Sequence, residues 1–184
     1  MALRNALLAA LIDREASGYD LAKQFRSSVA NFWTATPQQL YRELEKMEAE
    51  GLLSARLVKQ DKRPDKRIFS VTGAGRAALH AFSLRTPKPT TVRDELLIQV
   101  ESMAHGDVPS IRASIRSHQE ASRVRLSGYE QRLADILGTR SDAEFLATGS
   151  RIGPYLTLQR GISFERENLA WAELALDVLA RRFP

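Results

Sequence analysis

The sequence predicts a mainly α-helical (α+β) protein in two parts: an N-terminal helical domain with a two-stranded hairpin, and an all-helical C-terminal domain. Three observations indicate this organisation. Apolar residues recur at helical spacing through most of the 184 residues. A short segment after Gly51 is instead compatible with β-strands. A stretch with two prolines and three threonines at 83–91 is typical of a linker, because proline lacks an amide donor. We therefore place the domains at 1–85 and 86–184.

Composition excludes several classes of protein. Hydrophobic residues make up 43% and charged residues 27%, as in an ordinary globular protein. The chain has no cysteine, which excludes disulfides, thiolate metal sites and a cysteine nucleophile. No stretch approaches the ~18 apolar residues of a membrane helix. The apolar start at 1–12 runs directly into Asp13, Arg14 and Glu15 without a cleavage pattern, so we expect a mature helix and a cytoplasmic protein with no membrane partner.

The positive charge is unevenly distributed. The net charge is +5, and residues 1–85 hold fourteen basic and nine acidic residues, whereas residues 86–184 hold thirteen of each. Six basic residues fall between Arg56 and Arg67. A basic half joined to a neutral half indicates a module that binds a polyanion beside a module with another role.

The N-terminal domain begins with two predicted helices. Leucines and Ile12 recur at helical spacing over residues 3–12, and Ser17 and Gly18 interrupt the pattern. A second helix then runs from Tyr19 to about Ser27 or Ser28. The aromatic residues of 31–33 are too apolar for a solvated loop, so we expect them to fill a core between helices.

A third helix over 36–50 has the clearest start signal in the chain. Thr36 stands at the N-cap, Pro37 at the first helical position and Gln39 three residues after the cap, which is a capping box. Gly51 ends the helix. The apolar stripe that would face the core comprises Leu40, Leu44 and Met47.

A basic hairpin and a fourth helix follow. Residues 53–59 and 68–71 are strand candidates, and the polar segment 59–67 between them contains turn residues. Thr72 then opens a helix that extends to about Phe82. The order of helix, helix, capped helix, hairpin and helix is that of a winged helix-turn-helix, in which the capped helix enters the major groove of DNA.

The third helix and the hairpin loop carry side chains suited to DNA. Amide and guanidinium groups pair with adenine or guanine edges, whereas the phenol and the lysines reach phosphates. The helix N-terminus also favours an anion. The predicted DNA-binding residues are Thr36, Gln38, Gln39, Tyr41, Arg42, Lys46, Lys62, Arg63, Lys66 and Arg67.

Other interpretations of these residues stay open. The basic loop could be a solvated charged turn, and Tyr41 could pack beneath its helix. The whole domain could serve as a protein-interaction adaptor, since fold alone does not decide function. An adaptor has no need to concentrate the positive charge around the third helix and the hairpin, so the charge distribution favours double-stranded DNA as the partner.

The sequence predicts that the C-terminal half is helical. We expect helices at 92–103 and from about Pro109 to Gly138, an irregular segment at 139–154 with a turn at 143–146, and a last helix. A second apolar strip on this last helix includes Trp171, and two strips require two neighbours, one of them a second subunit. Its heptad seam supplies the predicted dimerisation residues Leu158, Ile162, Leu169, Leu176, Leu179 and Phe183.

Four segments of the N-terminal domain resemble the PadR family of transcriptional regulators. They are Gly18–Lys23, Phe32–Trp33, Gln39–Leu53 and Phe69–Arg76. The long helical C-terminal half is similar in architecture to the branch with an extended dimerisation domain, which includes virulence-gene activators. The resemblance implies a homodimeric repressor that reads a palindromic operator with its third helix and wing, and in many members a small aromatic ligand releases the DNA.

No residue pattern indicates catalysis. The three histidines are far apart and match no metal-ligand spacing, and Gly73–Gly75 lacks the context of a dinucleotide site. We therefore expect no enzyme activity, no cofactor and no metal. Tyr155 and Trp171 are weak candidates for an effector pocket, with aromatic packing as the alternative.

Overall fold

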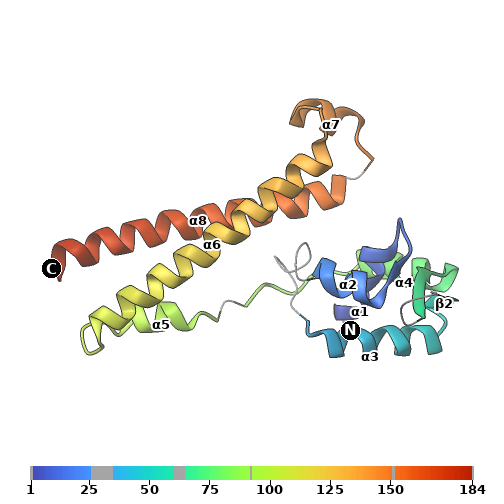
Figure 1. The fold of residues 1–184 in the computed structure, drawn as a ribbon, viewed down its shortest axis with the longest axis horizontal. Coiled ribbons are helices and arrows are strands. Elements are labelled where there is room, and N and C mark those ends of the chain that lie inside the picture. The colour runs from blue at the N-terminus through green and yellow to red at the C-terminus, as the bar shows by residue number, and fades with distance from the viewer. Residues whose placement is uncertain (1, 26–34, 60–64, 92, 151, 184) are drawn as a thin grey trace. The chain divides into compact units, whose positions relative to one another are not determined.

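The computed structural model describes residues 2–25, 35–59, 65–91, 93–150 and 152–183. The chain divides into two compact units, Met1–Pro89 and Thr90–Pro184 (Figure 1). Each unit has its own hydrophobic clusters. The predicted aromatic plug at 31–33, the end of the second helix and part of the basic loop lie outside the described residues.

The first unit is a winged helix-turn-helix, as predicted. Three antiparallel strands stand in the order β1-β3-β2, and β2 pairs with β3 from Leu53↔Val71 to Val58↔Lys66. The pairing of β1 with β3 was not predicted, because two residues are too short to show a period. The elements are α1 (Ala2–Leu11), β1 (Ala16–Ser17), α2 (Gly18–Gln24), α3 (Pro37–Ala49), β2 (Leu53–Val58), β3 (Lys66–Val71) and α4 (Gly73–Ser83).

The start and end of α3 are confirmed. The hydroxyl of Thr36 accepts a hydrogen bond from the amide of Gln39 at 3.2 Å, and the Gln39 carboxamide oxygen accepts one from the Thr36 amide at 2.9 Å. Gly51 follows the helix with a φ of 72°, which a side chain would disfavour. The stripe Leu40, Leu44 and Met47 is buried in one cluster with residues of α1, α2, β2 and β3. The sequence pattern thus fixes which face of α3 meets the core.

A close approach at Gly75 joins α4 to the turn that follows α3. A Cβ atom at Gly75 would collide with the backbone oxygen of Leu52 and lie 2.8 Å from a methyl carbon of Val71. The Thr72 hydroxyl caps this helix by accepting from the Gly75 amide at 3.1 Å and donates to the Gly51 oxygen at 2.7 Å. Only glycine fits this position without a backbone shift.

Gly75→Ala should therefore destabilise the protein by about 1–3 kcal/mol, because backbone rather than a side chain must move. Chemical denaturation followed by circular dichroism measures this loss. Gly73→Ala is the matched control, since nothing lies within 4 Å of its added Cβ in the same helix turn. An equal response of the two variants would contradict the close approach.

The second unit consists of helices. The long helices α6 and α8 pack side by side, and α5 packs against α6 (Figure 1). The helix predicted at 92–103 is shorter than expected, and the segment 139–154 is less irregular than expected, since the turn predicted at 143–146 is part of a helix. That segment contains α7, whose capping box joins Ser141 to Glu144. The elements are α5 (Glu95–Glu101), α6 (Val108–Leu137), α7 (Asp142–Thr148) and α8 (Ile152–Arg182).

The heptad seam of α8 is largely filled within the chain. Leu158, Ile162 and Leu179 are 5%, 1% and 1% exposed. Leu158 and Ile162 cluster with Tyr129 of α6, and Leu179 clusters with Ile111 and Ile115 of the same helix. Of the other seam residues, Leu169 and Leu176 are half-buried, whereas Phe183 is exposed. Because α6 already covers Leu158, Ile162 and Leu179, these three seam residues are not free to contact a second copy.

Candidate nucleic-acid interface

The face of α3 opposite its buried stripe is polar and exposed. Gln38, Arg42 and Lys46 lie on this face, and none forms an ion pair or side-chain hydrogen bond with another residue that the structure describes. Glu45 shares their exposure. The buried stripe on the other side holds the helix against the core, so these side chains are presented on a fixed support.

Gln39 has a different role from its neighbours. Its carboxamide oxygen is bound by the Thr36 amide in the capping box. Bidentate recognition of adenine needs both the oxygen and the nitrogen of an amide group. Gln39 would therefore have to leave the cap to read a base in this way, whereas Gln38 needs no such change.

Tyr41 packs against the start of α2. A Cβ at Gly18 would lie 2.9 Å from the Tyr41 ring carbon Cδ1, so the ring covers the glycine closely. The side chain nevertheless remains 44% exposed. One side of the ring thus packs in the helix-turn-helix while the rest faces solvent, and the contact of Tyr41 with DNA stays a prediction.

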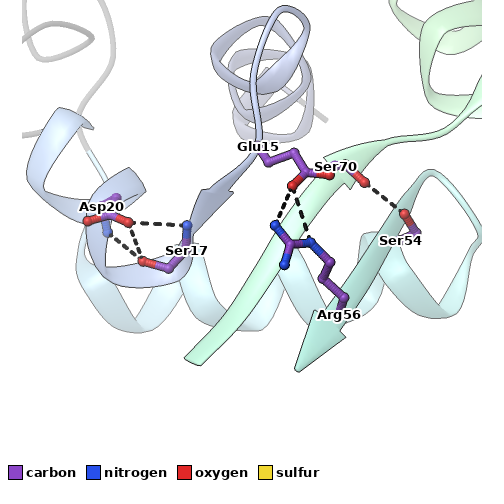
Figure 2. Close-up of polar contacts among 6 residues, drawn as sticks. All are labelled: Glu15, Ser17, Asp20, Ser54, Arg56 and Ser70. Carbon is purple, nitrogen blue, oxygen red and sulfur yellow. Dashed lines mark hydrogen bonds and ion pairs between the residues drawn. The ribbon is translucent and has the colours of Figure 1, made fainter. Parts of the chain in front are cut away.

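Two of the four predicted DNA-binding residues of the wing lie in the part of it that the structure describes. Lys66 and Arg67 begin β3, whereas Lys62 and Arg63 lie outside the described residues. A hydrogen bond of 2.8 Å between the hydroxyls of Ser54 and Ser70 joins β2 to β3 (Figure 2).

Three cations of this hairpin are paired with acids from other parts of the same unit. Arg56 donates to Glu15 at 2.8 Å (Figure 2), and the Lys66 ammonium lies 2.9 Å from Asp20. Arg67 forms an ion pair with Glu48 of α3. The sequence reasoning missed all three acids as partners, because each lies 19 to 46 residues from its cation.

An ion pair between a buried carboxylate and a partly exposed arginine joins the two long helices of the second unit. Glu165 of α8 accepts from Arg125 of α6 at 2.7 and 3.0 Å, and the side chain of Glu165 is 4% exposed. Asn168 and Ser122 complete this polar cluster. Glu165 falls on the heptad seam, where the sequence pattern alone suggests an apolar contact.

The two candidate effector residues lie far apart on one helix. Tyr155 is buried against Phe145 of α7 and accepts from Gln159 at 3.1 Å. Trp171 meets the His118 ring edge-on, with 6.4 Å between the ring centroids. Sixteen residues of continuous helix separate Tyr155 from Trp171, or roughly 24 Å at the α-helical rise. One small molecule cannot contact both within a single chain.

An apolar strip of α8 remains about half exposed or more. It consists of Leu156, Phe164, Leu174 and Val178, which are 56%, 47%, 63% and 50% exposed. At 3.6 residues per turn these positions fall on the side of α8 opposite the seam that packs on α6. We call this set the α8 outer strip.

No group of three or more potential metal-ligating side chains occurs among the described residues. No helix in the described part of the chain is both long and apolar enough to cross a membrane.

Two family descriptions match consecutive parts of the chain. Residues 7–81 match the Transcriptional regulator PadR-like family, and residues 92–180 match the Virulence activator alpha C-term. The chain is also 31% identical to the Mycobacterium tuberculosis protein named "Probable transcriptional regulator Rv1176c", over 99% of this chain and 100% of that one. It is 30% identical to the Negative transcriptional regulator PadR of Bacillus subtilis, over 96% and 97% of the two chains.

Solved structures show the same architecture. Bacillus subtilis PadR in complex with operator DNA has a TM-score of 0.77 at 25% identity and covers 97% of this chain and 99% of its own. The same protein has been solved with p-coumaric acid, with a TM-score of 0.70 at 24% identity and coverage of 97% and 95%. The Vibrio cholerae virulence activator AphA has a TM-score of 0.71 at 28% identity and coverage of 97% and 98%. The chain therefore belongs to the PadR-like family of transcriptional regulators, with the C-terminal domain of the virulence activators.

Proposed function

We propose that this protein is a dimeric repressor that reads a palindromic operator with α3 and contacts phosphates with its wing. The observation that carries the proposal is the exposed polar face of α3. Gln38 and Arg42 stand next to a capped N-terminus and are held there by the buried stripe on the other side. Such a helix can place amide and guanidinium groups against base edges in the major groove.

The relatives support both parts of this proposal. The Bacillus subtilis relative is named a negative transcriptional regulator, and its structure has been solved with operator DNA. We carry repression and operator binding to this chain as an inference from full-length similarity. The basic balance of residues 1–85 adds a sequence-independent attraction to DNA.

The dimer contact in this proposal is the α8 outer strip. Four large apolar side chains along about six turns of one helix form a surface that a second copy can cover. A symmetric pair of chains would place two α3 helices on half-sites about one helical turn apart.

A small aromatic effector completes the proposal. The Bacillus subtilis relative binds p-coumaric acid in a solved structure, and we extend the same class of ligand to this chain. Addition of p-coumaric acid to the preformed complex tests this step, because release of labelled DNA reports effector binding directly. Retention of the complex would remove this acid from the proposal.

A fluorescence anisotropy titration tests DNA recognition. The protein is added to a labelled duplex from upstream of its own gene and to a scrambled duplex of equal length, each at two salt concentrations. Tighter binding to the upstream duplex with a steep salt dependence is the expected result. Equal binding would contradict sequence reading at this site. The absence of binding to either duplex at low salt would favour the adaptor function instead.

Arg42→Ala should weaken operator binding by about 1–3 kcal/mol and relax the preference at one operator position. The physical reason is loss of a two-pronged contact with a guanine edge. Arg42→Lys is the control, because it keeps the charge but lacks the planar fork of the guanidinium group. A lysine variant that restores full affinity would make Arg42 a phosphate contact.

A further inference from the structure

The ammonium group of Lys66 is held by an acid that is itself fixed in place. Asp20 stands in the first turn of α2 and accepts from the Ser17 hydroxyl at 2.7 Å as well as from Lys66 at 2.9 Å. The capping box holds this carboxylate independently of the wing. Hydrogen bonding from Ser17, and then from Lys66, lowers the pKa of Asp20, so the group carries a full negative charge at neutral pH.

Arg67 is held by an acid from another helix. Glu48 lies in the last turn of α3 and pairs with the Arg67 guanidinium, which also lies 5.4 Å from the centre of the Phe69 ring. Lys66 and Arg67 are consecutive in β3, so their side chains leave the strand on opposite faces. Two helices thus hold the base of the wing from two sides.

Other cations of the same unit are unpaired within the part of the chain that the structure describes. Arg42 and Lys46 on α3 and Lys59 after β2 are exposed, and they form no ion pair with any residue in the described ranges. These three can meet phosphate directly. Lys66 and Arg67 are already bound to Asp20 and Glu48, so a phosphate has to compete with these carboxylates for them.

Resting on the DNA-binding function proposed above, we propose that Asp20 and Glu48 set the affinity for DNA by competing with phosphate for Lys66 and Arg67. Neither acid touches the DNA in this scheme. Each one lowers the affinity for every sequence alike. Each also reduces the salt dependence, because a freed carboxylate takes up a cation while the phosphate releases one.

Asp20→Asn and Glu48→Gln test the competition separately. Each variant should bind a labelled duplex of scrambled sequence about two- to fivefold more tightly at low salt, the range expected for an exposed ion pair. The slope of log affinity against log salt should steepen by up to about one per substitution. Unchanged affinity and slope in both variants would overturn the proposal. Glu48 lies outside the α2 capping box, so its variant does not depend on that cap.

Two matched variants separate ion pairing from net charge. Asp65→Asn removes the same charge beside Lys66, and Glu45→Gln removes it one turn before Glu48 on α3. Neither acid forms an ion pair with a residue that the structure describes. Tightening by these controls equal to that of Asp20→Asn and Glu48→Gln would overturn the proposal, since net charge would then explain the effect.

A double-mutant cycle with Lys66→Met identifies the partner. The gain from Asp20→Asn should disappear in the Lys66→Met background, because no ammonium group is left to release. A gain that persists there overturns the proposal. If the wild-type protein binds DNA but none of these substitutions changes the binding, this inference is contradicted and the proposed function is not. Wild-type protein that binds neither the upstream nor the scrambled duplex at low salt contradicts the proposed function as well.

Discussion

Arg125→Met should destabilise the pairing of α6 with α8 by about 3 kcal/mol, because it leaves a buried carboxylate without its counter-charge. Glu165 is 4% exposed on its side chain and receives two hydrogen bonds from Arg125. Methionine fills a similar volume, so the loss reports the missing charge and hydrogen bonds rather than a cavity. Denaturant unfolding followed by circular dichroism measures it, since α6 and α8 are the longest helices described.

The same two helices supply a control. Arg166 of α8 pairs with Glu130 of α6 at 2.8 Å, but both side chains are about half exposed or more. Arg166→Met should therefore cost no more than about 1 kcal/mol. Equal losses from the two arginine variants would contradict the view that burial of Glu165 makes its pair important.

The pH dependence gives a second readout of the Glu165 pair. Burial raises the pKa of Glu165, but hydrogen bonds from Arg125, Ser122 and Asn168 outweigh it, so the pKa lies below the ordinary value. Such a group stabilises the fold above its unfolded pKa and loses that contribution as the pH falls through its folded pKa. In Arg125→Met the hydrogen bonds from Ser122 and Asn168 remain, but the charge and the hydrogen bonds of the arginine are lost, so less opposes the effect of burial and protonation of Glu165 becomes easier. The stability difference between wild type and variant should therefore shrink as the pH falls from neutral through the ordinary titration range of a glutamate.

Local signals in the sequence were sufficient for α3. The capping box at Thr36, the stripe of Leu40, Leu44 and Met47, and the glycine at 51 all act within one helix. Propensity, capping and burial agree there, which is why both ends and the buried face could be predicted. The capping box of α7 at Ser141 and Glu144 carried the same kind of signal, and the prediction overlooked it.

Features set by tertiary packing could not be predicted. The two residues of β1 form a strand only because β3 lies beside them. The basic residues of the wing are visible in the sequence, but their pairing with Asp20 and Glu48 arises from folding. Likewise, a heptad seam shows that a helix has an apolar neighbour without showing which chain supplies it. In this protein α6 covers the most buried positions of that seam.

Since α6 covers the most buried seam residues, the α8 outer strip is the place to test the dimer. Leu174 is 63% exposed and lies near the middle of the strip's C-terminal half, on the side of α8 away from α6. Leu174→Glu introduces a charge there without disturbing the seam residues. We expect a monomer in light scattering with the helical circular dichroism signal retained. Ala180→Glu adds the same charge at an exposed position of α8 outside the strip, and it should leave the dimer intact.

Loss of the dimer should also weaken operator binding by about 100-fold or more. A dimer binds its second half-site as an intramolecular step, at a high effective concentration, whereas a monomer gains only one set of contacts. Binding to scrambled DNA should fall much less, because single heads still neutralise phosphates. A Leu174→Glu protein that remains dimeric would place the contact between copies elsewhere. A monomer with full operator affinity would instead show that one α3 and one wing are sufficient for recognition.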